Sequence, residues 1–430
     1  MTEGPGILLP PAARSRAALG LTAAAAAGRF ELQVCRVCGA VQYPPRDACH
    51  RCLSVLLDWK LQDGRGELIS ETTVLHSQDA FFRARLPIRL GLVRLASGPT
   101  AVVYLHDEVP AAPVPVEVDV RLDKAGLAAL VAFPLGGVAK SSAADATQKR
   151  LLREMSCDPR DRKILVADGA GAVGLALVQA LVEAGARHVW AGYRLGSEGV
   201  VALKELAGRY EQVSLLLLDV TSQESVEQAA AGVATQVDVV VSNAQVSGEP
   251  GPAPGVGSGR GPESELAAGP DPEPGPGPSA GLQIAQEAMD VYYFGLLRLA
   301  TAFAPTMRAR AAASSDSPVT AWVNLLSIYA LSSFPQESFL SAAYAAAHSF
   351  SQTLRAEMLT AGIRVVNVFP GPLAPASLMP ASLAGAIVES LRAGVEDVYP
   401  GDVAQEWYST WRANPKVLER ELSVAAEPQT

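Results

Sequence analysis

Apolar and polar positions alternate with a period of two through residues 59–134. The clearest of these short runs are residues 66–74, 91–95, 100–105 and 116–121, and Gly, Pro and Asp separate them. Such alternation between turn residues is typical of β-strands, and several short strands in one segment favour a closed fold. We therefore expect a small all-β barrel over residues 59–134.

The pattern changes at Lys163, where short apolar runs begin to alternate with longer segments of helical periodicity. Strands are predicted at residues 163–166, 188–191, 214–219, 237–242, 321–326 and 364–369. Helices are predicted at residues 175–184, 200–209, 222–231, 282–312 and 342–359. This alternation predicts an α/β domain of Rossmann type with a doubly wound parallel sheet.

The chain of 430 residues is too long for one hydrophobic core, so the fold class is multidomain. The predicted parts are an N-terminal helix with a cysteine cluster at 1–58, the barrel at 59–134, a linker at 135–160, the Rossmann-type domain at 161–402 and a C-terminal tail at 403–430.

Residues 246–280 interrupt the Rossmann-type domain and are nearly all Gly, Pro, Ser, Ala and acidic residues. Such a composition cannot bury a core, and we expect a disordered loop there. It is either a tolerated insertion or a tether that screens the ligand cleft.

Charge and hydropathy exclude two kinds of partner. The net charge of −9 and the pI near 5.2, without a basic stretch, argue against nucleic acid. No uninterrupted run of about 18 strongly apolar residues is present, so we expect no membrane span. Four of the five cysteines cluster as a metal site would require, which favours a reducing compartment, and we expect a cytoplasmic protein.

The cysteine cluster consists of two CxxC pairs, Cys35-Arg-Val-Cys38 and Cys49-His-Arg-Cys52. Two thiolates separated by two residues converge on one ion from a tight turn, and two such turns complete a tetrahedral site. We expect a structural zinc ion on Cys35, Cys38, Cys49 and Cys52, with no coordination position left for catalysis. Chance spacing or disulfides in a secreted protein are the alternatives.

The segment around these cysteines, residues 28–134, resembles the zinc-ribbon plus OB-fold proteins that accompany thiolases and aldolases acting on acyl-CoA. The resemblance includes the stretch between the two CxxC pairs, Asp63-Gly-Arg-Gly66 and Leu86-Pro-Ile88. It implies that the ribbon docks onto a thiolase or aldolase and that the barrel contributes to binding an acyl-CoA. It supplies no catalytic residue.

A glycine motif, Gly169-Ala-Gly171-Ala-Val-Gly174, lies between a predicted strand and a predicted helix. Glycines at this spacing let the backbone approach a pyrophosphate at the N-terminus of the helix. The motif therefore predicts a dinucleotide site that uses Gly169, Gly171 and Gly174. A tight turn in an α/β fold without a ligand is the alternative.

Residues from about 160 to 402 resemble the short-chain dehydrogenase/reductase family. The resemblance places NAD or NADP against residues that follow successive strands: Arg194, Asp219, Val220, Asn243, Ala244, Pro370 and Gly371. It makes Tyr344 the general acid/base and Ser327 the residue that orients the substrate oxygen.

The sequence departs from this family at several positions. The family's Tyr-x-x-x-Lys is Tyr344-Ala-Ala-Ala-His348 here, and a mostly neutral histidine lowers the pKa of a tyrosine poorly. Without gaps, Asp168 and Ala172 fall on two glycine positions of the family's loop, whereas a one-residue shift restores more glycines. In the first alignment Asp168 would place negative charge near a pyrophosphate unless it faces away. Tyr292 stands where the family's relay asparagine is expected.

Two functions remain open. The first is an NAD(P)-dependent oxidoreductase that interconverts a hydroxyacyl-CoA and a ketoacyl-CoA, with Tyr344, Ser327 and a weakened His348 as its catalytic residues. The second is a catalytically silent accessory or scaffold subunit of a thiolase, aldolase or dehydrogenase complex. The resemblance also implies a dimer through the long helices at 282–312 and 342–359.

Overall fold

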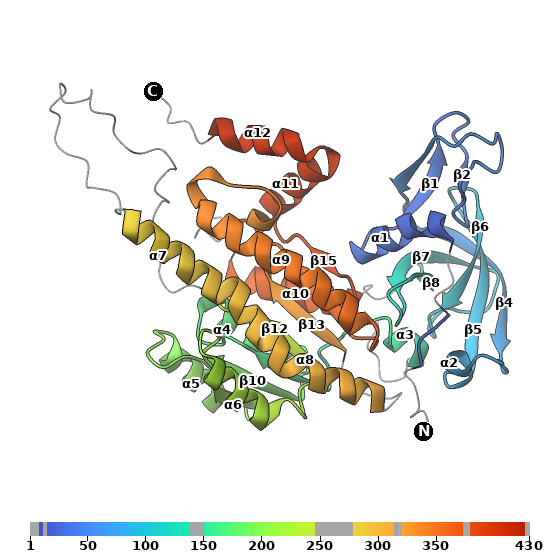
Figure 1. Cartoon of the computed structure of the whole chain (residues 1–430). Helices are drawn as coiled ribbons and strands as arrows, with labels where there is room; N and C mark the ends of the chain where they lie inside the picture. Colours follow the sequence, from blue (N-terminus) through green and yellow to red (C-terminus); the bar gives the residue numbers. More distant parts are fainter. Residues whose placement is uncertain are drawn as a thin grey trace, which may run out of the picture.

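The computed structural model describes residues 8–11, 15–136, 150–245, 278–313, 318, 320–372 and 379–425. A ribbon and a barrel, blue to cyan in Figure 1, lie beside an α/β domain, green to red. The loop expected at 246–280 lies outside the described residues, except for the first residues of helix α7. The predicted succession of ribbon, all-β barrel and doubly wound parallel sheet is confirmed.

The N-terminal part begins with a 3₁₀ turn, Arg16–Ala18, and helix α1 (Leu19–Ala26). Three antiparallel strands follow in the order β2-β1-β3, namely β1 (Glu31–Cys35), β2 (Val41–Gln42) and β3 (Leu57–Leu61). Helix α1 buries Leu21 and Ala25 in the same apolar cluster as the interior of the barrel. The helix therefore covers one side of the barrel and shields its apolar interior from water.

The barrel closes in the order β4-β5-β6-β8-β7, with only β6 and β8 parallel. Its strands are β4 (Arg65–Val74), β5 (Ile88–Leu95), β6 (Thr100–Leu105), β7 (Val114–Leu122) and β8 (Ala128–Pro134), with helix α2 (Ala80–Arg83) after β4. Leu68, Val93 and Val118 point inward and are fully buried. A register shift between Leu68 and Ser70 bends β4, as closure of a small barrel requires.

The segment expected to be a linker contains helix α3 (Arg150–Arg153), and residues 137–149 lie outside the described residues. Leu151, Leu152 and Met155 are buried against Ile88 and Phe133 of the barrel. Apolar packing therefore holds residues 150–155 on the barrel wall, although the composition of residues 135–160 is largely polar.

The α/β domain has seven parallel strands in the order β11-β10-β9-β12-β13-β14-β15. The strands are β9 (Lys163–Val166), β10 (His188–Tyr193), β11 (Val213–Leu217), β12 (Val239–Ser242), β13 (Ala321–Leu325), β14 (Arg364–Val368) and β15 (Asp397–Val398). The order reverses between β9 and β12, and ligands of such sheets bind at the carboxyl ends of strands at this point.

Helices cover both faces of this sheet. One apolar cluster packs α4 (Ala172–Glu183), α5 (Val200–Arg209) and α10 (Pro380–Ala393) on one face. The opposite face holds α6 (Gln223–Val233), α8 (Gly295–Ala313) and α9 (Ser338–Leu359). Fully buried Trp322, Phe303 and Leu177 lie in these two layers.

The long helix predicted at 282–312 is interrupted. It consists of α7 (Pro278–Ala288), a π-helical segment (Met289–Phe294) and α8. In Figure 1, α7 and α8 follow one another along nearly one line, and α9 runs beside them across one face of the domain. A π-helical segment often marks a functional position, and this one carries Tyr292.

The residues after β15 form two further helices, α11 (Asp402–Ala413) and α12 (Pro415–Ala425). Tyr408 stacks on Tyr399 at 3.7 Å between ring centroids, and Trp407 lies 4.8 Å from Phe334. Aromatic contacts therefore hold α11 on the domain. Within the described residues, no helix combines the length and apolar character needed to cross a membrane.

Hydrogen bonds join the barrel side of the chain to the α/β domain. The buried Arg364 guanidinium donates to the carbonyl oxygens of Leu122 at 3.0 Å and Asp123 at 3.1 Å. Arg121 donates to the carbonyl of Ala393 at 2.7 Å. These hydrogen bonds satisfy backbone carbonyl groups in the partly buried contact between the two parts. They therefore hold the barrel side of the chain against the α/β domain.

Candidate functional site

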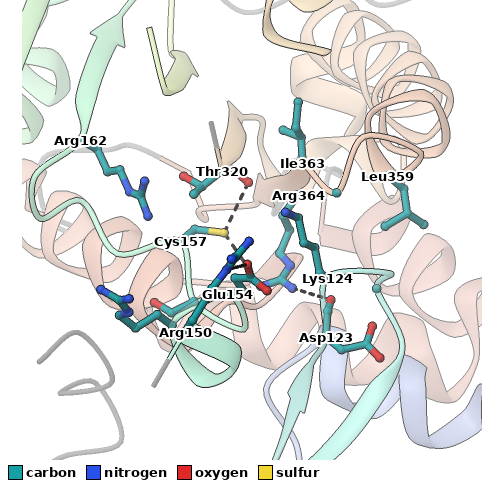
Figure 2. A pocket seen from close by; sticks show the side chains of 14 residues that line it. Asp123, Lys124, Arg150, Glu154, Cys157, Arg162, Thr320, Leu359, Ile363 and Arg364 are labelled. Carbon is teal, nitrogen blue, oxygen red and sulfur yellow. Dashed lines mark hydrogen bonds and ion pairs between the residues drawn. The ribbon is translucent and has the colours of Figure 1, made fainter. Parts of the chain in front are cut away.

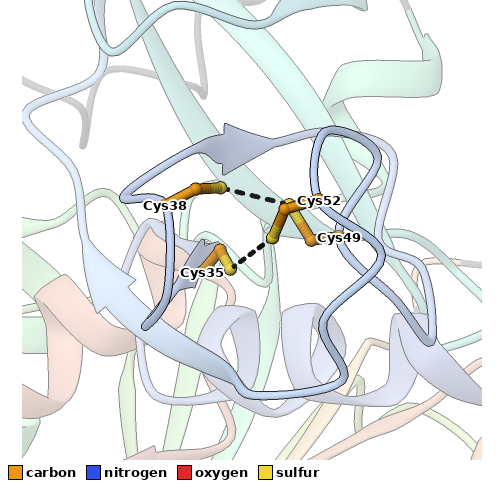
Figure 3. A group of neighbouring side chains, drawn as sticks. All are labelled: Cys35, Cys38, Cys49 and Cys52. Atoms are coloured by element: carbon orange, nitrogen blue, oxygen red, sulfur yellow. Dashed lines mark hydrogen bonds between the residues drawn. The ribbon is translucent and has the colours of Figure 1, made fainter.

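The four cysteines of the ribbon converge on one point (Figure 3). All four sulfur atoms lie within 4.8 Å of one another. The Sγ atoms of Cys35 and Cys52 are 3.5 Å apart, and those of Cys38 and Cys49 are 3.6 Å apart. Four sulfurs at these separations surround a space that suits one tetrahedral zinc ion.

The two knuckles repeat the same backbone geometry. The N–H of Gly39 donates to the carbonyl of Cys35 at 2.9 Å, and that of Leu53 donates to the carbonyl of Cys49 at 3.0 Å. Gly39 and Leu53 both have a positive φ, +70° and +62°. The left-handed residue turns the chain back so that both thiols of a pair face the ion.

Backbone N–H groups act on the thiols of both knuckles. The backbone N–H of Cys38 lowers the pKa of Cys35 to about 6, and backbone N–H groups in the second knuckle lower the pKa of Cys49. A backbone N–H acts in the same direction on Cys52, but burial and the neighbouring thiols outweigh it and raise the pKa of that thiol to about 12. Deprotonated sulfur is the form that binds zinc. His50 lies outside the ligand group, since its Nδ1 is 3.2 Å from Oε1 of Gln42. The predicted structural zinc site is confirmed, and its four donors close it to chemistry.

The glycine loop follows β9 and leads into α4. A Cβ on Gly174 would lie 1.9 Å from the carbonyl oxygen of Asp168, and a Cβ on Gly169 would lie 2.8 Å from the Cβ of Ala191. A Cβ on Gly171 would meet the Asp168 carboxylate at 3.1 Å. Glycine at 169 and 174 therefore follows from close packing of the loop on β10 and on its own backbone.

The carboxylate of Asp168 occupies the inside of this loop. Its Oδ1 accepts hydrogen bonds from the N–H groups of Ala170 and Gly171, each at 3.1 Å. Burial raises the pKa of Asp168, while the two N–H donors and the charge of Arg194 oppose that rise. Asp168 does not face away, and it takes up N–H groups that a pyrophosphate would otherwise use.

The residues predicted at the ends of the next strands lie around this loop. Asn243 braces it, because its side chain accepts from the N–H of Asp168 at 2.9 Å and donates to the Asp168 carbonyl at 2.7 Å. A narrow cavity of about 50 Å³ lies beside the loop and is lined by residues that include Arg194, Asp219, Val220 and Ala244.

Tyr344 is buried, and its ring lies against that of Tyr292 with 4.2 Å between centroids. Burial raises the pKa of Tyr344 well above its usual value, and Tyr292 and Tyr329 raise it further. The free space around Tyr344 and Tyr292 is only about 10 Å³. Tyr292 therefore fills the space beside the predicted acid/base.

The other two predicted catalytic residues have local partners. Ser327 is buried and its Oγ accepts from the N–H of Tyr329 at 3.3 Å. His348 has its ring 5.1 Å from that of Phe369, and its Nε2 lies 3.4 Å from the Gln352 amide nitrogen. Burial lowers the pKa of His348, which keeps it neutral rather than cationic.

Pro370 and Gly371 follow β14, as predicted. The carbonyl of Pro370 accepts from the N–H of Ile328 at 2.9 Å, which joins this turn to the segment that carries Ser327. Tyr329 is the residue near the site that sequence reasoning missed. Burial raises its pKa to about 12, and its position two residues after Ser327 was the available signal.

A nicotinamide dinucleotide is the cofactor that such a fold implies. The glycine loop and Asn243 have the geometry for it, but the Asp168 carboxylate occupies N–H donors of the loop. The space beside Tyr344 is far smaller than a nicotinamide ring. The residues therefore keep the fold of a dinucleotide site, and the Asp168 carboxylate competes for two N–H donors of its loop.

Comparison with protein families gives three matches. Residues 22–55 match "ChsH2, rubredoxin-like zinc ribbon domain", and residues 59–125 match "ChsH2, C-terminal OB-fold domain". Residues 162–261 and 267–383 match "short chain dehydrogenase". A search of curated proteins finds no match.

Solved structures of short-chain dehydrogenases are similar to part of this chain. One from Burkholderia cenocepacia, in complex with NADP, is 26% identical, with a TM-score of 0.49, over 63% of this chain and all of that one. One from Streptomyces avermitilis is 24% identical, with a TM-score of 0.45, over 62% of this chain and 98% of that one.

The third family match covers half of the chain and coincides with the parallel sheet and the glycine loop. The first two coincide with the cysteine cluster and the barrel. The chain therefore belongs to the short-chain dehydrogenase family, a family of NAD(P)-dependent dehydrogenases and reductases, and carries a ChsH2-type zinc ribbon and OB-fold domain ahead of the dehydrogenase domain.

Proposed function

We propose that this protein is an accessory subunit of an acyl-CoA-processing enzyme of thiolase or aldolase type. Its dehydrogenase domain serves as a scaffold without hydride transfer, and its ribbon and barrel bind the partner. The observation that carries the proposal is the burial of Tyr344 against Tyr292, with a neutral His348 at the lysine position.

The chemistry of Tyr344 supports the loss of catalysis. A tyrosine acts as an acid/base near neutral pH only when a cation lowers its pKa, and here burial and two tyrosines raise the pKa. A neutral histidine cannot reverse this effect. Proton transfer at this position is therefore slow at neutral pH.

The surface of the ribbon supports partner binding. Val37, Leu53, Val55 and Leu56 are exposed, with Leu53 at 78% and Val55 at 73% of their full accessibility. We call these four residues the ribbon patch. Exposed apolar side chains within and beside the two zinc knuckles are typical of a protein–protein contact. The patch supports docking of the ribbon to a partner enzyme. The structural zinc ion then holds the ribbon in the shape that presents the patch.

Co-purification tests this proposal. The full chain should form a stable complex with a thiolase or aldolase from its own cell, identified by mass spectrometry and then reconstituted from purified components. Leu53→Ser combined with Val55→Ser should weaken that complex at least about tenfold. The two serines bury less apolar area against the partner than the leucine and valine do. Val201→Ser, an exposed apolar residue on α5, is the matched control. A complex that tolerates the double substitution would overturn the role of the ribbon patch.

A second candidate function is an oxidoreductase that acts on a hydroxyacyl-CoA or ketoacyl-CoA. The retention of Ser327, Tyr344 and the Asn243 brace favours it. It requires the Asp168 carboxylate to leave the glycine loop and Tyr292 to leave Tyr344. NADPH oxidation with acetoacetyl-CoA, followed by absorbance, separates the two functions, because only the enzyme gives turnover with the unmodified chain.

We also propose a cytoplasmic location and a dimer through α7, α8 and α9. The location suits four thiols that must stay reduced to hold zinc. Exposed Leu282 and Phe294 on the long helix support the dimer, since water contact with both is unfavourable in a monomer. The mass in solution, measured by light scattering, tests it.

A further inference from the structure

A cavity of about 390 Å³ lies between the barrel and the dehydrogenase domain (Figure 2). Its walls come from the turn between β7 and β8, from α3 and the residues after it, and from the segment that joins α9 to β14. The volume falls in the range of small-molecule sites, about 300–1,000 Å³. Both halves of the protein therefore contribute to one pocket, which is partly open to solvent.

This cavity is separate from the dehydrogenase centre. Arg162 lies just before β9, Thr320 just before β13, and Arg364 at the start of β14. These are the amino ends of parallel strands, whereas the glycine loop follows the carboxyl end of β9. The cavity therefore lies at the opposite edge of the sheet from the site at which this fold binds dinucleotides.

The lining carries an excess of positive charge. Five cationic side chains and two carboxylates line it, and the cations are Lys124, Arg150, Arg153, Arg162 and Arg364. Glu154 already accepts from Arg85 at 2.9 Å and from Arg150 at 3.0 Å. Asp123 accepts from the N–H groups of Ala125 and Leu127 in its own turn. The cations exceed the carboxylates, so the lining is positive overall. Arg150 is held by Glu154, Arg364 by backbone carbonyls, and Nη1 of Arg162 donates to the carbonyl of Pro318.

Polar groups on the wall also lack partners. Among the described residues, neither Nε of Arg162 nor Oγ1 of Thr320 has a hydrogen-bond partner, although both atoms are buried. In Figure 2 the Arg162 guanidinium points toward Thr320 and Cys157, into the space between the two halves. Unpaired buried polar groups are unfavourable, and an anionic ligand that draws Arg162 inward would satisfy them.

The chemistry of the wall indicates the kind of ligand. Guanidinium groups match phosphate oxygens in charge and geometry. The cavity exceeds one phosphate group in volume, and Leu359 and Ile363 add an apolar side. We propose that this cavity binds a phosphate-bearing small molecule of nucleotide size between the barrel and the dehydrogenase domain. This proposal is independent of the function proposed above.

Isothermal titration of the full-length, zinc-loaded protein tests it with three probes: inorganic phosphate, ADP and adenosine 3′,5′-bisphosphate. We expect the two nucleotides to bind and inorganic phosphate to bind at least about tenfold more weakly, because it lacks the organic part. Arg162→Met and Arg153→Ala should each weaken nucleotide binding about tenfold, as the loss of a charged contact does. Arg209→Ala, an exposed arginine on α5, should leave it unchanged.

The other outcomes overturn the proposal. Equal affinity for inorganic phosphate would exclude a nucleotide-sized ligand. Nucleotide binding that Arg162→Met leaves unchanged but Asp168→Gly alters would assign the ligand to the glycine loop. No binding of any probe would exclude the site. Thr320→Val gives a second variant in case Arg162→Met lowers the thermal unfolding temperature, and it should weaken binding without affecting stability.

Discussion

The zinc ribbon and the dehydrogenase centre are two polar sites of the same chain. They differ in whether their polar groups have partners within the chain. In the ribbon, four sulfurs within 4.8 Å of one another point at one common centre. In the dehydrogenase centre, Asp168 fills the glycine loop and Tyr292 fills the space beside Tyr344. The ribbon keeps its donors for an outside ion, while the centre satisfies its donors from within the chain.

This difference shows that the contacts that hold a fold together can persist while the groups at its ligand site change. Asn243 still braces the loop, and the glycines still pack where a Cβ would collide. Those features hold β9, β10 and β12 together, so they serve the fold whether or not a ligand binds. The positions at which the sequence departs from the family, 168, 292 and 348, are those that the resemblance places toward a ligand, and here their side chains contact other parts of the chain.

Loss of the zinc site has the largest expected effect. Cys49→Ser should abolish zinc binding, because three thiolates leave the tetrahedron incomplete and structural zinc contributes about 10–16 kcal/mol in small modules. Metal analysis of the purified variant measures it, and limited proteolysis should cut within residues 28–62 while the dehydrogenase domain resists. Cys157→Ala, at a buried cysteine outside the cluster, is the control. Full zinc content in Cys49→Ser would contradict a four-cysteine site.

Reversal of two changes in the dehydrogenase centre comes next. His348→Lys combined with Tyr292→Asn should raise NADPH-dependent reduction of acetoacetyl-CoA by at least about 100-fold, the scale of general acid/base catalysis. The lysine supplies a cation and the asparagine removes the ring that covers Tyr344. Adding Tyr344→Phe to this pair should remove the gain. An unmodified chain already as active as the double variant would show that the centre is not silenced.

The glycine loop gives an intermediate effect. Asp168→Gly should tighten NADPH binding about tenfold, because the N–H groups of Ala170 and Gly171 become available to a phosphate. Quenching of protein fluorescence follows the titration. Asp168→Asn keeps the hydrogen bonds without the charge. Its affinity for NADPH should therefore lie between those of the unmodified chain and Asp168→Gly. Equal affinities for all three proteins would mean that Asp168 does not compete with the cofactor.

The smallest effect concerns pH. Burial lowers the pKa of His348 below its ordinary 6.5, so protonation favours the unfolded chain. The stability that neutral His348 contributes is present above pH 6.5 and is lost as the pH falls through the pKa of the folded state. Urea unfolding from about pH 7.5 to about pH 5 should show a shallower decline for His348→Gln than for the unmodified chain. His76→Gln, at an exposed loop position, is the control. Identical slopes for all three would contradict this role.

Local patterns predicted much of the fold. Strands 163–166 and 364–368 and the helix at 200–209 follow from runs of apolar residues with clear periods. The zinc ligands follow from spacing alone, because each CxxC pair is a single turn. The π-helical segment was not predictable, since residues 289–294 have ordinary helical periodicity and their altered winding depends on packing.

The parts of the site that could not be predicted depend on residues far apart in the sequence. Asp168 was recognised as an unfavourable charge, but its hydrogen bonds to the loop depend on a conformation that no pattern encodes. Tyr292 and Tyr344 are 52 positions apart and meet only in the folded core. Arg364 reaches the carbonyls of Leu122 and Asp123 more than 240 positions away. Spacing cannot reveal contacts of this kind.

Leu53 combines a strained backbone conformation with an exposed apolar side chain. It is a leucine in the left-handed conformation that Gly39 adopts in the other knuckle, and such a residue carries strain of about 1–2 kcal/mol. It is also among the most exposed apolar side chains of the protein. A glycine would adopt this conformation without strain, and in the docking that we propose the leucine side chain offsets that cost by its contact with the partner. Leu53→Gly would therefore make the second knuckle more stable and lower the affinity of the ribbon for its partner. One residue thus sets the balance between folding and binding.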